Sequence, residues 1–128
     1  MRVKTSEATP LQVNYLVAKC KFPDAHTKDV EVWIQPLSCD DPADFAFEPS
    51  TNWSQGGPII EREKISIEYM VGAGAGGLDV WVATRIKNMA LSEECAPTPL
   101  VAAMRCYVAS RLGDEVDVPD ELVVTDDV

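Results

Sequence analysis

The chain has 128 residues, of which 46% are hydrophobic and 25% charged, and its formal net charge is −10. A chain of this size can bury a core as one domain without disulfides or a metal ion to hold it together. The acidic excess argues against direct nucleic-acid binding, which needs clustered Lys and Arg. No apolar run approaches the ~20 residues of a membrane span, so we expect no membrane partner.

The acidic residues concentrate near the C-terminal end. Residues 113–128 hold seven acidic and no basic residues, whereas residues 1–112 hold 14 acidic and 11 basic ones. Blocks of like charge are usually solvated tails, but apolar residues alternate with the acids here, so part of this segment can dock. We predict one domain over residues 1–118 and an acidic, flexible tail over 119–128. The open alternative is an acidic surface that meets a basic partner.

The first predicted elements are a helix over residues 7–20 and a strand over 30–35. Thr9 followed by Pro10 is typical of a helix start, with a capping hydroxyl before a proline at the first helical position, and Ser6 is an alternative cap a few residues earlier. The strand is indicated by alternation of β-branched and polar residues. Residues 37–58 show little periodicity and predict a long loop of the kind that is usually functional or disordered.

Short strands are predicted over residues 59–60, 65–70 and 78–84, with irregular chain over 85–98. A helical turn over residues 61–64 is an equal alternative to a connection between the first two strands. Residues 72–77 match the glycine spacing of dinucleotide-binding loops, but a strand follows them where that motif needs a helix. We therefore interpret them as a hairpin loop.

The clearest element is a helix that begins after Thr98, has Pro99 at its first position and ends before Gly113. Strands in the middle of the chain and helices at its ends predict the α+β class. We expect a single domain with an antiparallel sheet of three to five strands and two helices packed on it.

No metal site or catalytic triad is indicated. The cysteines are too widely spaced for a zinc motif, and the only histidine stands alone in the sequence. We therefore expect reduced thiols, with those on the two helices buried, and neither metal nor cofactor. The residues concerned are Cys20, Cys39, Cys95, Cys106 and His26.

The most distinctive segment is 49–63, which combines an aromatic, two amides, two glycines and three charges in what we interpret as a loop leading into a strand. Trp53 has three interpretations: a cap on the core, a platform for a planar ligand, or an interface anchor. Glu61 and Glu63 can act as acid and base, but a charged edge strand or a turn that is ion-paired with Arg85, Arg105 or Arg111 explains them better.

Three blocks of sequence resemble a family of small phage proteins named NinX. They are residues 1–7 with 16–20, the central segment 49–63, and residues 98–110 with 113–116. The glycine-rich stretch between residues 70 and 96 departs from the family pattern. The resemblance implies a phage or prophage accessory protein in the bacterial cytoplasm, which fits the absence of an apolar signal segment at the N-terminus. It implies no reaction, because the family is one of unknown function.

Three functions remain open. The first is a binding protein without catalysis that sequesters a nucleotide-like molecule as a counter-defence, with Trp53 stacking on a base and Arg62 or Arg105 pairing with phosphate. The second is an acidic inhibitor of a host enzyme, such as a nuclease or defence factor, and the third is a small nucleotide-acting enzyme. Exposed strand edges also make a homo-oligomer plausible. The predicted ligand-binding residues are Asn52, Trp53, Gln55, Gly56, Gly57, Pro58, Glu61, Arg62 and Arg105.

Overall fold

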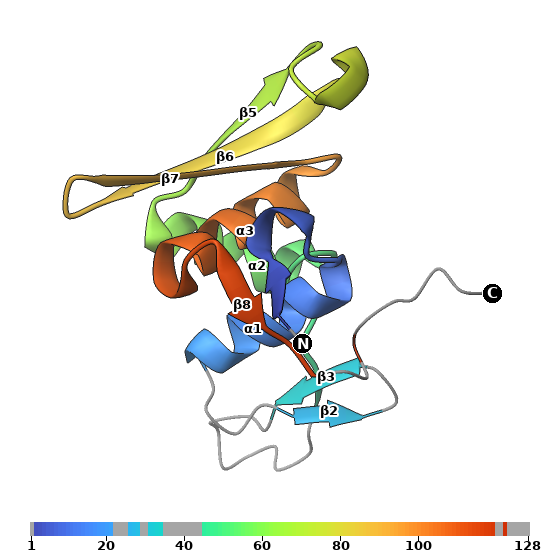
Figure 1. Cartoon of the computed structure of the whole chain (residues 1–128). Coiled ribbons are helices and arrows are strands. Elements are labelled where there is room, and N and C mark those ends of the chain that lie inside the picture. Colours follow the sequence, from blue (N-terminus) through green and yellow to red (C-terminus); the bar gives the residue numbers. More distant parts are fainter. Residues whose placement is uncertain (1, 22–25, 29–30, 35–44, 120–121, 123–128) are drawn as a thin grey trace.

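The computed structural model describes residues 2–21, 26–28, 31–34, 45–119 and 122. Its elements confirm the α+β class, with strands divided among three antiparallel sheets and a third helix that the sequence did not predict (Figure 1). In chain order they are β1 (Arg2–Lys4), η1 (Thr5–Glu7), α1 (Pro10–Lys21), β2 (His26–Lys28), β3 (Glu31–Ile34), β4 (Phe45–Ala46), α2 (Trp53–Glu63), β5 (Ser66–Met70), η2 (Ala75–Gly77), β6 (Val80–Lys87), β7 (Ala90–Ala96), α3 (Pro99–Leu112) and β8 (Glu115–Asp117).

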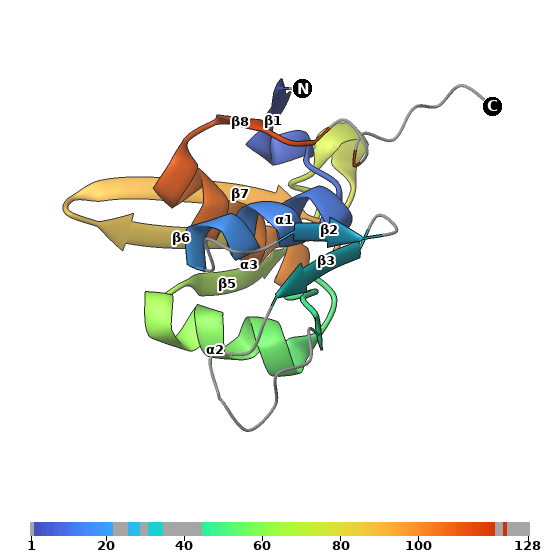
Figure 2. The same ribbon diagram turned by 90° about the horizontal axis from the view of Figure 1, so that it is seen from below.

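The three-stranded sheet β5–β6–β7 is covered on one face only. Helix α3 packs on its inner face, and α1 and α2 pack on α3 in turn. Figures 1 and 2 show the sheet on one side of the molecule with the helices gathered on the other side of it. None of the described elements covers the outer face of this sheet, and most of the side chains on that face are exposed.

Helix α3 is the centre of the core and confirms the predicted boundaries. The Thr98 hydroxyl accepts the first-turn bond from the Val101 N–H at 3.3 Å, and the Gly113 N–H closes the last turn on Ala109. Most of the circumference of α3 is buried, because the helix is enclosed by the sheet and two helices. Its buried residues are Leu100, Val101, Ala102, Ala103, Met104, Cys106, Tyr107 and Val108.

Helix α1 begins at Pro10, which confirms the start signal at Thr9 and Pro10, and not at residue 7, because residues 5–7 form the separate turn η1. A capping box fixes this start. The Thr9 hydroxyl accepts from the Gln12 N–H at 3.2 Å, and the Gln12 side chain accepts from the Thr9 N–H at 3.0 Å.

Residues 49–52 form a loop as predicted, but the predictions of a loop over 53–58 and a strand over 59–60 were wrong, and the helical turn that was the alternative over 61–64 is closer to the structure. Residues 53–63 form helix α2, in spite of two glycines and Pro58, which cannot donate to the carbonyl one turn earlier. Tertiary packing outweighs the low helix propensity of these residues, because Ile59 is buried in the core and Gly56 packs closely against Pro49 and Leu100. Lys64 then ends the helix in the left-handed conformation.

The prediction of irregular chain over residues 85–98 was also wrong. Strand β6 continues to Lys87, and β7 returns beside it in register from Lys87 opposite Ala90. Only two residues connect the strands, Asn88 and Met89, and both have positive φ, as the tightest hairpin turns require. The turn lacks the glycine that normally signals it. The hairpin interpretation of residues 72–77, by contrast, is confirmed by the pairing of β5 with β6.

Part of the acidic C-terminal segment is ordered. Strand β8 pairs with β1, and the Thr5 hydroxyl donates to the Gly113 carbonyl at 2.7 Å. Val116, Val118 and Leu122 are buried, and the Gln12 side chain donates to the Leu122 carbonyl at 2.9 Å. The expectation that part of this segment docks is therefore confirmed, while the boundary at residue 118 stays a prediction.

The predicted strand over 30–35 is confirmed as β3, which pairs with β2 and β4. Beyond β4, Phe47 is buried, as expected for an ordered loop that packs on the body. Of the cysteines, Cys106 is buried, Cys20 is half-buried and Cys95 is exposed. Cys39 and much of the predicted loop lie outside the described residues.

Candidate functional site

The two amides of the 49–63 segment organise the start of α2. Asn52 is the N-cap, and its side chain accepts from the Ser54 N–H at 2.9 Å. The Gln55 side chain accepts from the Glu48 N–H at 2.6 Å. Both side-chain oxygens are thus engaged in shaping the loop and the helix, which gives the amides a structural role that the sequence interpretation did not foresee.

Trp53 and Arg62 lie at opposite ends of α2. Trp53 is its first residue and is 56% exposed, so it is not the core cap that was one of its interpretations. Nine residues separate it from Arg62, which corresponds to about 13 Å along the axis and to opposite sides of the helix. The structure therefore does not bring these two side chains to one base and its phosphate, and nucleotide binding by this segment stays a prediction.

The glycines and proline of α2 differ in their surroundings. A Cβ on Gly56 would lie 2.6 Å from Leu100 Cδ2 and would also collide with the Pro49 carbonyl, so this glycine permits close helix packing. Gly57 has open space where a Cβ would stand. Pro58 is exposed within the helix.

Arg105 is held by the protein's own backbone. Its guanidinium donates to the Ala8 carbonyl at 2.7 and 3.1 Å and to the Cys95 carbonyl at 3.1 Å. Desolvation lowers the pKa of Arg105, although the Glu94 carboxylate opposes this shift. These bonds tie α3 to the chain before α1 and to β7, so Arg105 has a structural role.

Glu63 is also structural. Its carboxylate accepts a 2.6 Å bond from Arg85, and its backbone carbonyl accepts another from the same guanidinium at 3.1 Å. Of the three arginines that the sequence left open as partners in the alternative to catalysis, the structure pairs Arg85 with Glu63. Glu61 is exposed on α2, and Arg62 lies 3.2 Å from the second oxygen of Glu63.

The feature that sequence reasoning missed is the outer face of the β5–β6–β7 sheet. Alternation along the strands places Ala83 and Arg85 on the inner face, where both are buried, and their neighbours on the outer face. Ile86 is 72% and Leu91 63% exposed there. Ten side chains make up what we call the outer face: Ser66, Glu68, Met70, Val80, Val82, Thr84, Ile86, Leu91, Glu93 and Cys95.

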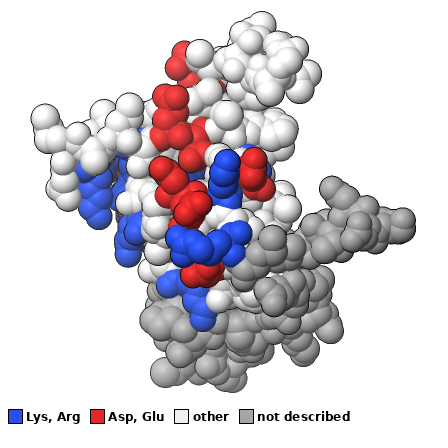
Figure 3. All heavy atoms as spheres, in the orientation of Figure 1, with Lys and Arg blue, Asp and Glu red and all other residues white. Residues whose placement is uncertain are grey.

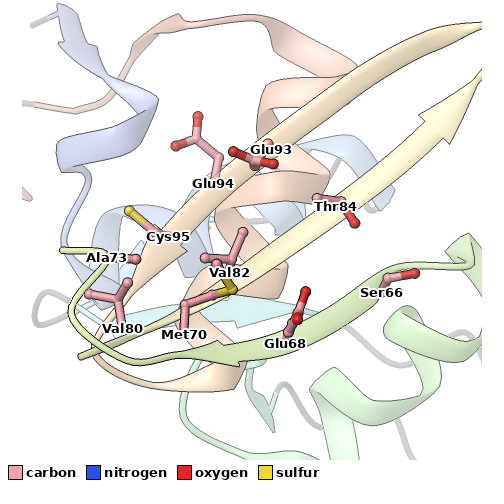
Figure 4. Close-up of a pocket in the computed structure, with 10 residues that line it drawn as sticks. All are labelled: Ser66, Glu68, Met70, Ala73, Val80, Val82, Thr84, Glu93, Glu94 and Cys95. Atoms are coloured by element: carbon pink, nitrogen blue, oxygen red, sulfur yellow. The ribbon is translucent and has the colours of Figure 1, made fainter.

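A shallow groove of about 350 Å³ lies over one part of the outer face (Figure 4). Its floor is apolar, with Val80 and Val82 on β6 and Met70 on β5. Glu68 stands on the β5 side and Glu93 on the β7 side. The alternation of β5 and β6 could have indicated this face, but the missed strand β7 concealed its width.

Acidic side chains continue from the outer face around the edge of β7. Figure 3 shows a band of Asp and Glu side chains in this view, with Lys and Arg side chains beside its lower part. Desolvation raises the pKa of Glu94, the negative charges of Asp114 and Glu93 raise it further, and the positive charge of Arg105 opposes them. Together with Glu115 these carboxylates line or adjoin a polar groove that Arg2 and Lys4 also line.

Within the part of the chain that the structure describes, no group of three or more His, Cys, Asp or Glu side chains could hold a metal ion. Among the same residues, no helix has the length and apolarity needed to cross a bilayer.

Together these observations define a small α+β domain with a three-stranded antiparallel sheet that a helix covers on one face only. The chain belongs to the family described as Bacteriophage P22, NinX, whose model matches residues 4–111. The match includes α1, α2, the whole β5–β6–β7 sheet and all of α3 except its last residue, Leu112. It confirms the resemblance drawn from the three sequence blocks. A search of the curated proteins gave no match.

Proposed function

We propose that this phage protein is a non-catalytic accessory protein that binds a protein partner through the outer face of the β5–β6–β7 sheet. One observation carries the proposal: a sheet face with side chains such as Ile86 and Leu91 largely exposed has no covering element among the described residues. Apolar side chains gathered on one surface are typical of interaction sites. We further propose that the protein acts in the bacterial cytoplasm and that its partner is a host enzyme or defence factor.

The charge of the protein supports an inhibitor in preference to the other two functions. An acidic surface speeds and selects the approach of a basic partner, such as the substrate groove of a nuclease. The nucleotide alternative loses the phosphate partners that it assigned, because Arg105 is held by backbone carbonyls and Arg62 lies far from Trp53. The enzyme alternative loses Glu63 to its ion pair with Arg85.

Site-specific photo-crosslinking in host cells tests the proposal. A photoreactive residue replaces Leu91 on the outer face or, in a matched variant, Trp53 on α2, since both positions are well exposed. We expect a host protein to be crosslinked from position 91 only, to be identified by mass spectrometry, and to bind the unmodified chain when purified. Crosslinking from position 53 alone would favour the 49–63 segment and overturn the proposed surface.

A further inference from the structure

We infer that the partner presents a cationic amphipathic helix, which lies along β6 on the outer face and covers it as α3 covers the inner face. This inference rests on the proposed function and adds the chemistry and secondary structure of the partner. Its observations are the apolar row on β6, the two flanking carboxylates and the dimensions of the sheet.

The apolar row of the outer face has the length of a short helix. It runs along β6 through Val80, Val82 and Ile86, with Thr84 between the last two, and spans about 20 Å at the rise of an extended strand. A helix of about 13 residues covers the same length at 1.5 Å per residue. Met70 and Leu91 extend the row on the neighbouring strands at its two ends.

The width of the outer face also fits one helix. The edge strands β5 and β7 lie on either side of β6, which separates them by about 10 Å at ordinary strand spacing. That separation equals the diameter of a helix with its side chains. The same sheet already accepts one helix, α3, on its inner face.

Charge decides which kind of helix fits. Glu68 is opposite Val82 on β5, and Glu93 is opposite Thr84 on β7, so one carboxylate stands on each flank of the apolar row. None of the ten outer-face residues is Lys or Arg. A helix with an apolar stripe and basic side chains on both flanks would bury its stripe on β6 and pair with both carboxylates.

The same charges disfavour a second copy of this chain as the occupant. If two outer faces met in a symmetric dimer, each would bring Glu68 and Glu93 and no cation from this surface. Like charges brought together in an interface are repulsive, so the face would need another occupant to neutralise it. A partner rich in Lys and Arg supplies that neutralisation.

A designed peptide of about 14 residues, with Leu on one helical stripe and Lys on both flanks, is the probe. One control peptide has the same composition in a scrambled order that forms no stripe, and another has Glu in place of Lys. Binding is measured by fluorescence anisotropy. Protection of the exposed Cys95 thiol from alkylation, read by peptide mass spectrometry, shows whether the peptide lies on the outer face.

Because a net charge of −10 attracts any cation, matched charge variants are essential. The Glu68→Lys/Glu93→Lys variant should weaken binding of the Leu/Lys peptide by about tenfold, since two exposed pairs become repulsive. The Glu7→Lys/Glu61→Lys variant changes two exposed carboxylates elsewhere by the same net charge and should have a much smaller effect. Circular dichroism confirms that each variant is folded.

Equal weakening by both double variants, equal binding of the scrambled peptide, or an unprotected Cys95 would overturn the inference. A dimer of the free chain that protects Cys95, detected by light scattering, would replace the partner helix with a second copy. If crosslinking from position 91 finds a host partner while the Leu/Lys peptide does not bind, the proposed function stands and only the helical, cationic partner is rejected.

Discussion

The Arg85 guanidinium donates to the Glu63 carboxylate across 2.6 Å, and both side chains are largely buried. The same guanidinium donates to the Ser110 hydroxyl at 2.6 Å, and it lies 5.8 Å from the centre of the Tyr107 ring. One residue on β6 therefore joins the end of α2 to α3 beneath the sheet. Glu63, one of the two candidate catalytic acids of the 49–63 segment, therefore has a structural role.

Removing one partner of this pair should strongly destabilise the fold. Glu63→Gln leaves the buried Arg85 charge without its counterion, which costs about 3 kcal/mol or more of unfolding free energy. Glu61→Gln, on the exposed side of the same helix, is the matched control and should change stability by less than about 0.5 kcal/mol. Urea denaturation of the three proteins measures both, and equal stabilities would contradict the assigned role of the pair.

The two adjacent glycines of α2 should respond oppositely to alanine. At Gly56 a methyl group would meet Leu100 and the Pro49 carbonyl, so Gly56→Ala should destabilise by about 1–3 kcal/mol through overpacking. At Gly57 a methyl group meets no atom within 4 Å, so Gly57→Ala should stabilise the helix by up to ~1 kcal/mol. Thermal unfolding of both variants measures the direction of each change in stability. A change in the same direction for both would contradict the described packing of α2.

Substitutions of Asn52 and Trp53 at the start of α2 should differ in their effects on stability. Asn52→Ala removes the helix cap and should cost about 1 kcal/mol of stability. Trp53→Ala removes a largely exposed ring and should have a smaller effect on the melting temperature. If Trp53→Ala instead abolishes binding of a partner or nucleotide while the melting temperature holds, the 49–63 segment is the recognition site.

Two cysteines should differ in their reaction with iodoacetamide at pH 8. Burial of Cys106, with a smaller contribution from the Glu94 charge, raises the pKa of its thiol to about 12, so the reactive thiolate is scarce. Cys95 is exposed on β7 and should be modified in the folded protein. Peptide mass spectrometry follows both residues, and modification of both in urea is the control. Rapid labelling of Cys106 in the native protein would mean that α3 is less enclosed than described.

Glu94 should make stability depend on pH. Because desolvation raises its pKa in the folded state, the folded protein holds this proton more tightly than the unfolded chain. The stabilising contribution is present below the unfolded pKa and is lost as the pH rises through the folded pKa. Glu94→Gln should therefore raise the melting temperature at pH 7 more than at pH 4. An equal change in melting temperature at both pH values would show that titration of the Glu94 carboxyl does not contribute to the effect of the substitution.

Local signals were sufficient where capping residues and apolar spacing agreed. Thr98, Pro99 and Gly113 mark the two ends of α3 in the sequence, and α3 has those ends in the structure. Alternation likewise located β3, β5 and most of β6. The NinX resemblance rested on three blocks of sequence and was confirmed by the family match.

Local signals failed where long-range contacts outweighed them. Glycines and a proline made α2 look like a loop, and its helix depends on contacts with Pro49, Leu100 and Arg85. Strand β7 was missed because its turn, Asn88-Met89, takes positive φ without a glycine.

The sequence by itself determined the fold class, the family, the acidic character and the principal helix, because caps, periodicity and composition are local or additive properties. Only the tertiary structure decided the roles of individual polar residues. Asn52, Glu63 and Arg105 have the chemistry of a binding site, but each is engaged by a partner within the fold. The open face of the β5–β6–β7 sheet emerges only when three strands are paired and one helix covers a single side of them.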